Sequence, residues 1–277
     1  MPTAPLALDR DDLAALTRFE RTSLGLGSFI NSSPRLKRAT RLFNEQVTGR
    51  WMRLVSEARI ELVGLEHATG LTADRGVLLA ANHRSFFDMF MVLTHLHRHV
   101  SWWERAYFPV RSAFWYDHPL GVVVNAVASA MSMYPPIYRE SEKRGATRAG
   151  LDFLAKELER PGTVVGIHPE GTRNKGSDPY ELLPGEPGFG RVVLQGRPIV
   201  LPIFINGMSN DFIKECRSTF DRTGPPIFIV IGKPVEFGEL LDADPQRLRS
   251  QIAVTRRVLE AIAELMPIEK RRRELCR

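Results

Sequence analysis

The feature that most constrains the fold of this chain is a set of short apolar runs spaced along its length. Runs of about four to eight apolar residues are typical of strands buried on both faces of a sheet. Apolar residues recur at helical spacing over 86–96 and 148–158, between two of these runs, and over 247–265, after the last run. This alternation predicts an α/β fold, in which helices cover a sheet. The runs are Ile60–Val63, Val77–Ala81, Val164–Ile167, Pro198–Ile205 and Ile227–Ile231.

The beginning of the chain has a different pattern. We expect a basic helical segment over 1–58 and one domain over 59–277, because apolar residues lie at helical spacing among basic ones from Arg10 onward. Breaks between two helices are expected at 25–27, which reads Gly-Leu-Gly, and at 31–34. Ser33 is suited to cap a helix that begins at Pro34.

The net charge is concentrated in this segment. The chain has 38 basic and 32 acidic residues, a net +6, and Arg10 to Arg59 alone has ten basic and five acidic residues, a net +5. Such a segment suggests an anionic partner. Without a nucleic-acid-binding motif, we expect a membrane surface and no nucleic acid. The alternative is that the helices pack on the domain with their arginines outward. The apolar residues expected to enter the bilayer are Phe19, Leu24, Phe29, Phe43 and Trp51.

The least polar stretch, His118 to Tyr138, has no formal charge. Its apolar part, Leu120–Met133, is shorter than the roughly 20 residues that a membrane-spanning helix needs. We therefore expect it to be buried or to lie at an interface. Only two cysteines are present, and we expect them to be free thiols in a reducing compartment. These features predict a cytoplasmic protein that is peripheral on the inner face of the membrane.

A histidine and an aspartate follow the run Val77–Ala81 at a spacing that suits general-base chemistry. The chain reads NHRSFFD from Asn82 to Asp88. The strand would deliver His83 to the sheet edge, where Asp88 can accept the Nδ1 proton across the turn. Nε2 is then free to take a proton from an attacking hydroxyl. In isolation such a pair is more often a histidine held by an aspartate for structural reasons.

A second polar loop follows the predicted strand Val164–Ile167. It reads HPEGTRN from His168 to Asn174. Proline, glycine and threonine favour a tight loop at the same sheet edge. Its backbone N–H groups, hydroxyl and guanidinium suit a phosphate or another oxyanion.

Together these residues resemble the glycerolipid acyltransferase family, typified by 1-acyl-glycerol-3-phosphate acyltransferases. NHRSFFD resembles the first motif block of the family, N-H-x-x-x-x-D, and PEGTR resembles the third. Pro198–Ile203 is similar to the fourth block, and Arg139 lies where the second block places its arginine. The resemblance extends from about Arg59 to Phe237. It implies a mixed β-sheet wrapped by helices.

The resemblance also implies a reaction, in which an acyl group moves from an acyl thioester, on CoA or acyl carrier protein, to a hydroxyl of a lysophospholipid. His83 would be the general base and Asp88 its orienting partner, with no metal and no bound cofactor. The expected partners are the acyl thioester donor and the lysolipid acceptor. The residues implied at the acceptor site are Asn82, Arg139, Glu170, Gly171, Thr172 and Arg173, with the arginines holding an acceptor phosphate.

Some positions depart from the family's pattern. Met133 and Pro136 stand where the second block has glycine and an aromatic residue, and Glu186 stands where many members have lysine. The missing lysine favours an alternative in which the acceptor is a non-phosphate lipid, such as an amino-acid lipid or a glycolipid. A further alternative is a non-catalytic lipid-binding member of the fold. His168 stands where phenylalanine is common, and it either reaches the site or packs.

Aromatic residues are concentrated between Trp102 and Tyr116, where seven of fifteen positions are aromatic. One interpretation is an interfacial belt or the wall of an acyl-chain tunnel, because amphipathic rings favour the level of the lipid headgroups. The alternative is ordinary core.

Overall fold

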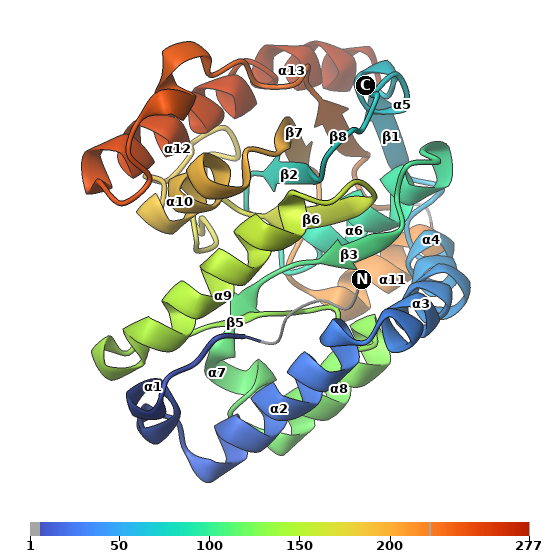
Figure 1. Cartoon of the computed structure of the whole chain (residues 1–277). Coiled ribbons are helices and arrows are strands. Elements are labelled where there is room, and N and C mark those ends of the chain that lie inside the picture. The colour runs from blue at the N-terminus through green and yellow to red at the C-terminus, as the bar shows by residue number, and fades with distance from the viewer. Residues whose placement is uncertain (1–5, 222, 277) are drawn as a thin grey trace.

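The fold is built on a six-stranded sheet (Figure 1). The structure is a computed structural model and describes residues 6–221 and 223–276. The strands are β1 (Ile60–Val63), β2 (Val77–Ala81), β3 (Arg105–Tyr107), β4 (Val110–Arg111), β5 (Pro136–Ile137), β6 (Thr163–Ile167), β7 (Ile199–Asn206) and β8 (Ile227–Ile231). The order in the large sheet is β1-β8-β7-β2-β6-β3, and β4 and β5 form a separate pair.

The strand directions place several loops at one edge of the sheet. β2 is parallel to β6 on one side and to β7 on the other, and β6 is parallel to β3. β8 is antiparallel to β7 and parallel to β1. The carboxyl ends of β2, β6 and β7 therefore meet. The predicted mixed α/β sheet is confirmed, and each of the five predicted strands lies within one residue of its expected bounds.

Helices cover both faces of this sheet (Figure 1). α10 packs against α9 and against α12, and α6 packs against β6. Gly166 in β6 permits the close approach of α6, because a Cβ there would lie 2.4 Å from Met89 Sδ. The helices after residue 59 are α5 (Glu66–Thr69), α6 (Asp88–Leu96), α7 (Ser112–Trp115), α8 (Pro119–Ser129), α9 (Arg144–Leu158), α10 (Pro187–Gly196), α11 (Phe212–Phe220), α12 (Leu248–Ala263) and α13 (Met266–Leu275), with 3-10 turns η2 (His97–His99), η3 (Ser141–Lys143) and η4 (Gly238–Asp242).

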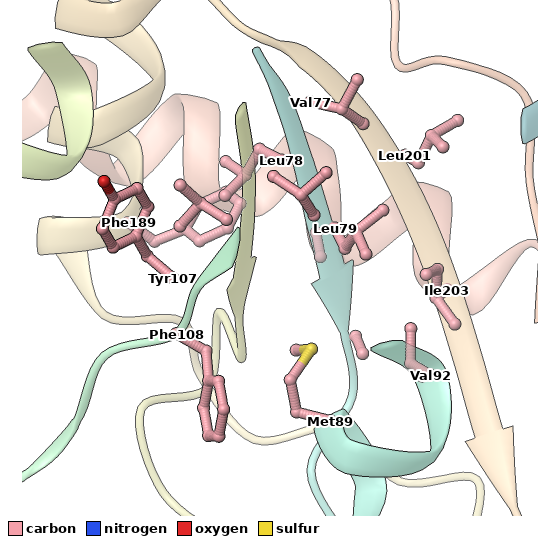
Figure 2. Close-up of a cluster of buried hydrophobic side chains, with 14 of the residues drawn as sticks. Val77, Leu78, Leu79, Met89, Val92, Tyr107, Phe108, Phe189, Leu201 and Ile203 are labelled. Atoms are coloured by element: carbon pink, nitrogen blue, oxygen red, sulfur yellow. The ribbon is translucent and has the colours of Figure 1, made fainter. Parts of the chain in front are cut away.

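The core is built around β2. All of its residues are fully buried, which explains why the run is apolar without alternation. Leu79 is the register partner of Leu201 in β7, and Figure 2 shows Met89 and Val92 reaching the cluster from α6. Packing therefore fixes the start of α6, which directly follows the His83 loop.

The N-terminal helices pack along the domain (Figure 1). Asn31 Nδ2 donates to the Met131 carbonyl at 2.8 Å, and Lys37 Nζ donates to the Ala106 carbonyl at 2.6 Å. Leu24 is buried in the core, so it cannot enter a bilayer as expected. Other apolar residues, such as Phe29, remain exposed. The elements are α1 (Arg10–Ala15), α2 (Arg18–Ser32), α3 (Pro34–Phe43), the π-helical η1 (Asn44–Thr48) and α4 (Gly49–Leu54).

The predicted break at 25–27 is wrong, because α2 runs without interruption from Arg18 to Ser32. Gly27 is instead a packing position, where a Cβ would lie 3.1 Å from Tyr116 Oη. Its small size lets the helix approach the domain closely. The second break is confirmed, since Ser33 Oγ accepts the Leu36 backbone N–H and α3 begins at Pro34.

The uncharged and aromatic stretches are mostly internal. Of the seven aromatic residues from Trp102 to Tyr116, five are buried, Trp102 is half-buried and Phe114 is 42% exposed. This stretch is therefore mainly core. The uncharged stretch forms α8, which is exposed on one side, and a buried connection over 131–136. Within residues 6–221 and 223–276, no helix combines the length and the apolar character needed to cross a membrane.

Candidate active site

The loops that follow β2 and β6 meet at the carboxyl edge of the sheet. The rings of His83 and His168, one from each loop, stack with centroids 3.9 Å apart and planes within 6°. The loop after β7 joins them, because Ser85 Oγ donates to the Ser209 carbonyl at 2.8 Å. These three loops bring the first and third motif blocks into one candidate site.

His83 and Asp88 are in contact at this site. His83 Nδ1 lies 3.3 Å from Asp88 Oδ2, which also accepts the backbone N–H groups of Arg84 and Ser85 at 2.6 Å each. The aspartate is buried, and these donors fix its position. A carboxylate acceptor at Nδ1 places the ring proton there, so Nε2 carries the lone pair. The His83 side chain is 19% exposed, which leaves part of the ring accessible.

Burial sets the protonation of this pair. Burial and, to a smaller extent, the Arg173 guanidinium lower the pKa of His83 below its ordinary value. Burial raises the pKa of Asp88 to about 6, although its backbone N–H donors act in the opposite direction. At pH 7 the ring is therefore neutral and the carboxylate is ionised, which is the state that a general base requires.

Glu170 holds the main chain of the His83 loop. Its Oε1 accepts the His83 backbone N–H at 2.8 Å, and its Oε2 accepts the Leu183 backbone N–H at 2.7 Å. The His83 carbonyl in turn accepts the Asn174 backbone N–H at 2.8 Å. Glu170 is buried, and burial raises its pKa. The Glu170 carboxylate therefore holds the His83 loop in position, and because it is buried it is not accessible to an acceptor.

Asn82 has a similar bracing position. Its Oδ1 accepts the Ile205 backbone N–H at 2.7 Å, and its Nδ2 donates to the Ile205 carbonyl at 3.0 Å. The oxygen and the nitrogen of this side-chain amide both bond to the backbone of β7, and the side chain is buried. It thereby extends the pairing of β2 with β7 up to the residue before His83.

Arg139 and Arg173 lie on the rim of the PEGTR loop. Arg139 Nη2 donates to the Gly171 carbonyl at 2.9 Å, and Arg173 Nη1 donates to Asn210 Oδ1 at 2.6 Å. Gly171 has a φ of 62°, a conformation that favours glycine, and Thr172 beside it is exposed. Two guanidinium groups and an exposed hydroxyl at one loop suit an anionic headgroup.

His168 packs against the candidate base. Its Nδ1 lies 2.9 Å from the Ala81 carbonyl and 3.0 Å from the Asn82 carbonyl, so Nδ1 carries the proton. Burial, together with the neighbouring His83, lowers its pKa to about 3. The neutral His168 ring is held by these two carbonyls, and its stacking on His83 fixes the plane of the His83 ring. His168 therefore lies at the candidate site and packs there against the ring of His83.

Two contributing residues are not predicted from the sequence. Arg84 donates to the carbonyls of Gly176 and Asp178 at 2.8 and 2.9 Å, which ties down the chain after PEGTR. Asn210 Oδ1 accepts the Phe86 backbone N–H at 3.0 Å as well as the Arg173 guanidinium. Arg84 lies inside the first motif block, and this position is the only sequence signal that points to it. Asn210 lies 124 residues beyond Phe86, and no spacing connects them.

Among the departures from the family's pattern, Glu186 is the one that lies at the site. Its backbone N–H donates to the Pro169 carbonyl at 2.8 Å, and a Cβ on Gly171 would come within 2.4 Å of Glu186 Cγ. Its side chain is exposed. An acidic group therefore lies beside the glycine that anchors Arg139. Met133 and Pro136 are buried, so those departures concern packing.

The structure brings a histidine–aspartate pair and a PEGTR loop together at one edge of an α/β sheet. The family model described as Acyltransferase matches residues 59–206, and the chain belongs to the acyltransferase family. This confirms the family expected from the motifs.

A solved structure shows the same fold. The chain is similar to the crystal structure of the 1-acyl-sn-glycerophosphate (LPA) acyltransferase PlsC from Thermotoga maritima, with a TM-score of 0.51 and 17% sequence identity. The match covers 89% of this chain and 88% of that chain. A search among curated proteins found no match.

Proposed function

We propose that this chain transfers a fatty acyl group from an acyl thioester, on CoA or acyl carrier protein, to the hydroxyl of a lysophospholipid such as 1-acylglycerol-3-phosphate. The observation that carries the proposal is the neutral His83 ring, held through Nδ1 by Asp88 beside two rim arginines. The family supports acyl transfer, and the printed name of the Thermotoga maritima protein supports a lysophosphatidate-type acceptor.

The chemistry needs one base and good positioning. The acceptor hydroxyl oxygen attacks the thioester carbonyl carbon while His83 Nε2 takes the hydroxyl proton. Asp88 stabilises the imidazolium that forms. The tetrahedral intermediate then collapses, the carbon–sulfur bond breaks, and the leaving thiolate takes the proton from His83. The ester is formed and the base is regenerated, so the proposal includes neither a metal nor a bound cofactor.

Five of the six residues implied at the acceptor site divide into two groups, and we assign the sixth, Gly171, to holding Arg139 through its carbonyl. Arg139, Thr172 and Arg173 are accessible on the rim, and we assign the acceptor phosphate to them. Asn82 and Glu170 are buried and bonded to the main chain, so we assign them to positioning the His83 loop.

Glu186 favours a second candidate acceptor. A carboxylate beside Gly171 repels a phosphate dianion and attracts a cationic group. An amino-acid lipid whose headgroup carries an ammonium group fits this arrangement, with His83 acting in the same way. The chemistry at the thioester is the same for both acceptors, and the rim selects between them.

We also propose that the protein acts from the surface of an anionic membrane, on its inner, cytoplasmic face. The N-terminal segment, with a net charge of +5 over Arg10 to Arg59, exposes Phe19, Phe29 and Trp51. Basic residues together with exposed aromatic rings are typical of segments that bind such a surface.

The experiment that tests this function measures thiol release from long-chain acyl-CoA and acyl-carrier-protein donors. Acceptors are 1-acylglycerol-3-phosphate, an amino-acid lipid with a free hydroxyl and a glycolipid. Acceptor-dependent release that is lost in His83→Ala supports the proposal, and the preferred acceptor decides between the two candidates. If neither donor releases thiol with any acceptor while the protein still binds lipid, the protein is a non-catalytic lipid-binding member of the fold.

A further inference from the structure

The arginines of the candidate active site are held by neutral oxygen atoms. Arg84 and Arg139 donate to backbone carbonyls, and Arg173 donates to the side-chain amide oxygen of Asn210. Among the residues that the structure describes, no carboxylate pairs with any of these three guanidinium groups, whereas Arg191 of α10 pairs with a carboxylate at 2.8 Å. An arginine that is held by a neutral oxygen is fixed in place and keeps its full charge for a ligand.

Asn210, in the loop after β7, joins Arg173 to the first motif block. Its Oδ1 accepts Arg173 Nη1 at 2.6 Å and the Phe86 backbone N–H at 3.0 Å, and its Nδ2 donates to the Arg84 carbonyl at 3.3 Å. An amide supplies both an acceptor and a donor, whereas a carboxylate supplies acceptors only. A carboxylate at this position could still hold Arg173, but it would cancel the charge of the guanidinium.

The loop that carries Asn210 is fixed on two sides. The Ser209 backbone N–H donates to Glu215 Oε1 at 2.7 Å, and Glu215 Oε2 accepts Arg59 Nη1 at 2.8 Å in an ion pair whose side chains are both buried. The Ser209 carbonyl accepts Ser85 Oγ at 2.8 Å. Because breaking a buried ion pair is costly, these contacts give the Asn210 side chain a defined position between the two motif loops.

Arg173 is close enough to the candidate base for its charge to act there. The pKa of His83 is lowered by burial and, to a smaller extent, by the Arg173 guanidinium. The same guanidinium lies over the ring of Phe86, 5.8 Å from the ring centroid. An anionic group that Arg173 binds therefore lies in the neighbourhood of His83, as the headgroup of an acceptor must.

We propose that Asn210 is a positioning residue that selects an anionic acceptor, because its neutral amide holds Arg173 beside the base without compensating the positive charge. The inference rests on the proposed function, since Arg173 is assigned there to the acceptor phosphate. Of the two candidate acceptors, this arrangement favours the lysophospholipid with a phosphate over the amino-acid lipid with an ammonium group.

The test measures equilibrium binding without any turnover. Isothermal titration calorimetry gives the Kd of 1-acylglycerol-3-phosphate and of its uncharged counterpart 1-acylglycerol, both below the concentrations at which they form micelles. The variant is Asn210→Asp. The matched control is Gln246→Glu, because the Gln246 amide oxygen also accepts an arginine, Arg191 Nη1 at 2.9 Å, so both variants place a carboxylate on an arginine.

Asn210→Asp is expected to weaken binding of the phosphate lipid on the order of tenfold and to leave the Kd of 1-acylglycerol within about twofold of wild type. Gln246→Glu is expected to bind both lipids like wild type. Asn210→Ala keeps the charge of Arg173 but no longer holds it, so the loss for the phosphate lipid is expected to be smaller, about threefold. A purely structural role predicts the opposite order, because aspartate still accepts from Arg173 and Phe86 whereas alanine does not.

Several results would overturn the inference. One is a greater loss in Asn210→Ala than in Asn210→Asp, and another is an equal loss for the two lipids. A wild-type protein that binds neither lipid, or an Asn210→Asp variant that binds both like wild type, would also overturn it. If Asn210→Asp does not fold by circular dichroism, Asn210→Ala decides, because a loss confined to the phosphate lipid supports the inference and an equal loss contradicts it.

The outcome for this inference is separate from the outcome for the proposed function. If the phosphate lipid binds and the variants behave as expected but no thiol is released, the proposed acyl transfer fails and the role of Asn210 stands. If thiol release depends on the phosphate lipid but its Kd is insensitive to Asn210→Asp, the proposed function stands and the role of Asn210 fails.

Discussion

Replacing Glu170 with glutamine is expected to disturb the His83 loop more than it disturbs acceptor binding. The Glu170 carboxylate accepts the backbone N–H groups of His83 and Leu183 at 2.8 and 2.7 Å. Glutamine has one oxygen, so its amide group must face one of those donors. A buried N–H that loses its acceptor costs about 1–3 kcal/mol. A loss of about 2 kcal/mol, the middle of that range, is expected to lower the Tm of a chain of this size by roughly 4–8 °C.

The assay for this variant separates positioning from binding. Thiol release measured against acceptor concentration gives kcat and the acceptor KM, and we expect kcat to fall by roughly tenfold or more with little change in KM. The matched control is Glu181→Gln, which changes an exposed carboxylate in the same loop and is expected to leave kcat and Tm at wild-type values. A raised acceptor KM with unchanged kcat and Tm would refute the reasoning, because Glu170 would then contact the acceptor.

Three further predictions concern the surroundings of the base. His168→Phe keeps a ring on His83 and is expected to hold kcat within about threefold, whereas His168→Ala loses roughly tenfold; equal losses in the two variants would count against the stacking role. Because burial raises the pKa of Asp88 to about 6, its protonation below that pH removes the acceptor at His83 Nδ1, so kcat/KM should fall as pH drops through about 6. A flat profile from about pH 5 to 7 would contradict this. Glu186→Lys is expected to raise kcat/KM for 1-acylglycerol-3-phosphate severalfold relative to an uncharged acceptor at low salt, and an unchanged ratio would remove Glu186 from acceptor choice.

The strands could be predicted from the sequence because burial on both faces leaves a continuous apolar run. β2 is the clearest case, with every residue buried. The edge strand β3 could not be predicted, because it has three residues, only one of which is buried. α10 also escapes prediction, since it contains several glycines that weaken a helix in isolation. At Gly190 the structural reason for a glycine is the close approach of α12, because a Cβ at that position would lie 2.0 Å from the Gln251 carbonyl oxygen.

The site could be predicted where chain spacing alone brings groups together. His83 and Asp88 are five residues apart across one turn, so the contact follows from the local chain. The partners of Glu170 do not follow in this way, because the sequence shows a carboxylate but not the N–H groups that it meets. The motif therefore suggests an acceptor contact, whereas the structure shows a bond to the backbone of His83. Only the sheet register, which places β2 beside β6, reveals that contact.

The central claim is that His83 takes the proton from an attacking lipid hydroxyl. The most direct test is the rate at which wild type and His83→Ala form acylated lipid, quantified by mass spectrometry at saturating donor and acceptor. The account predicts that His83→Ala loses about 10²–10⁴-fold in this rate while its Tm stays close to that of wild type. A folded His83→Ala protein that retains near-normal acylation would contradict the account.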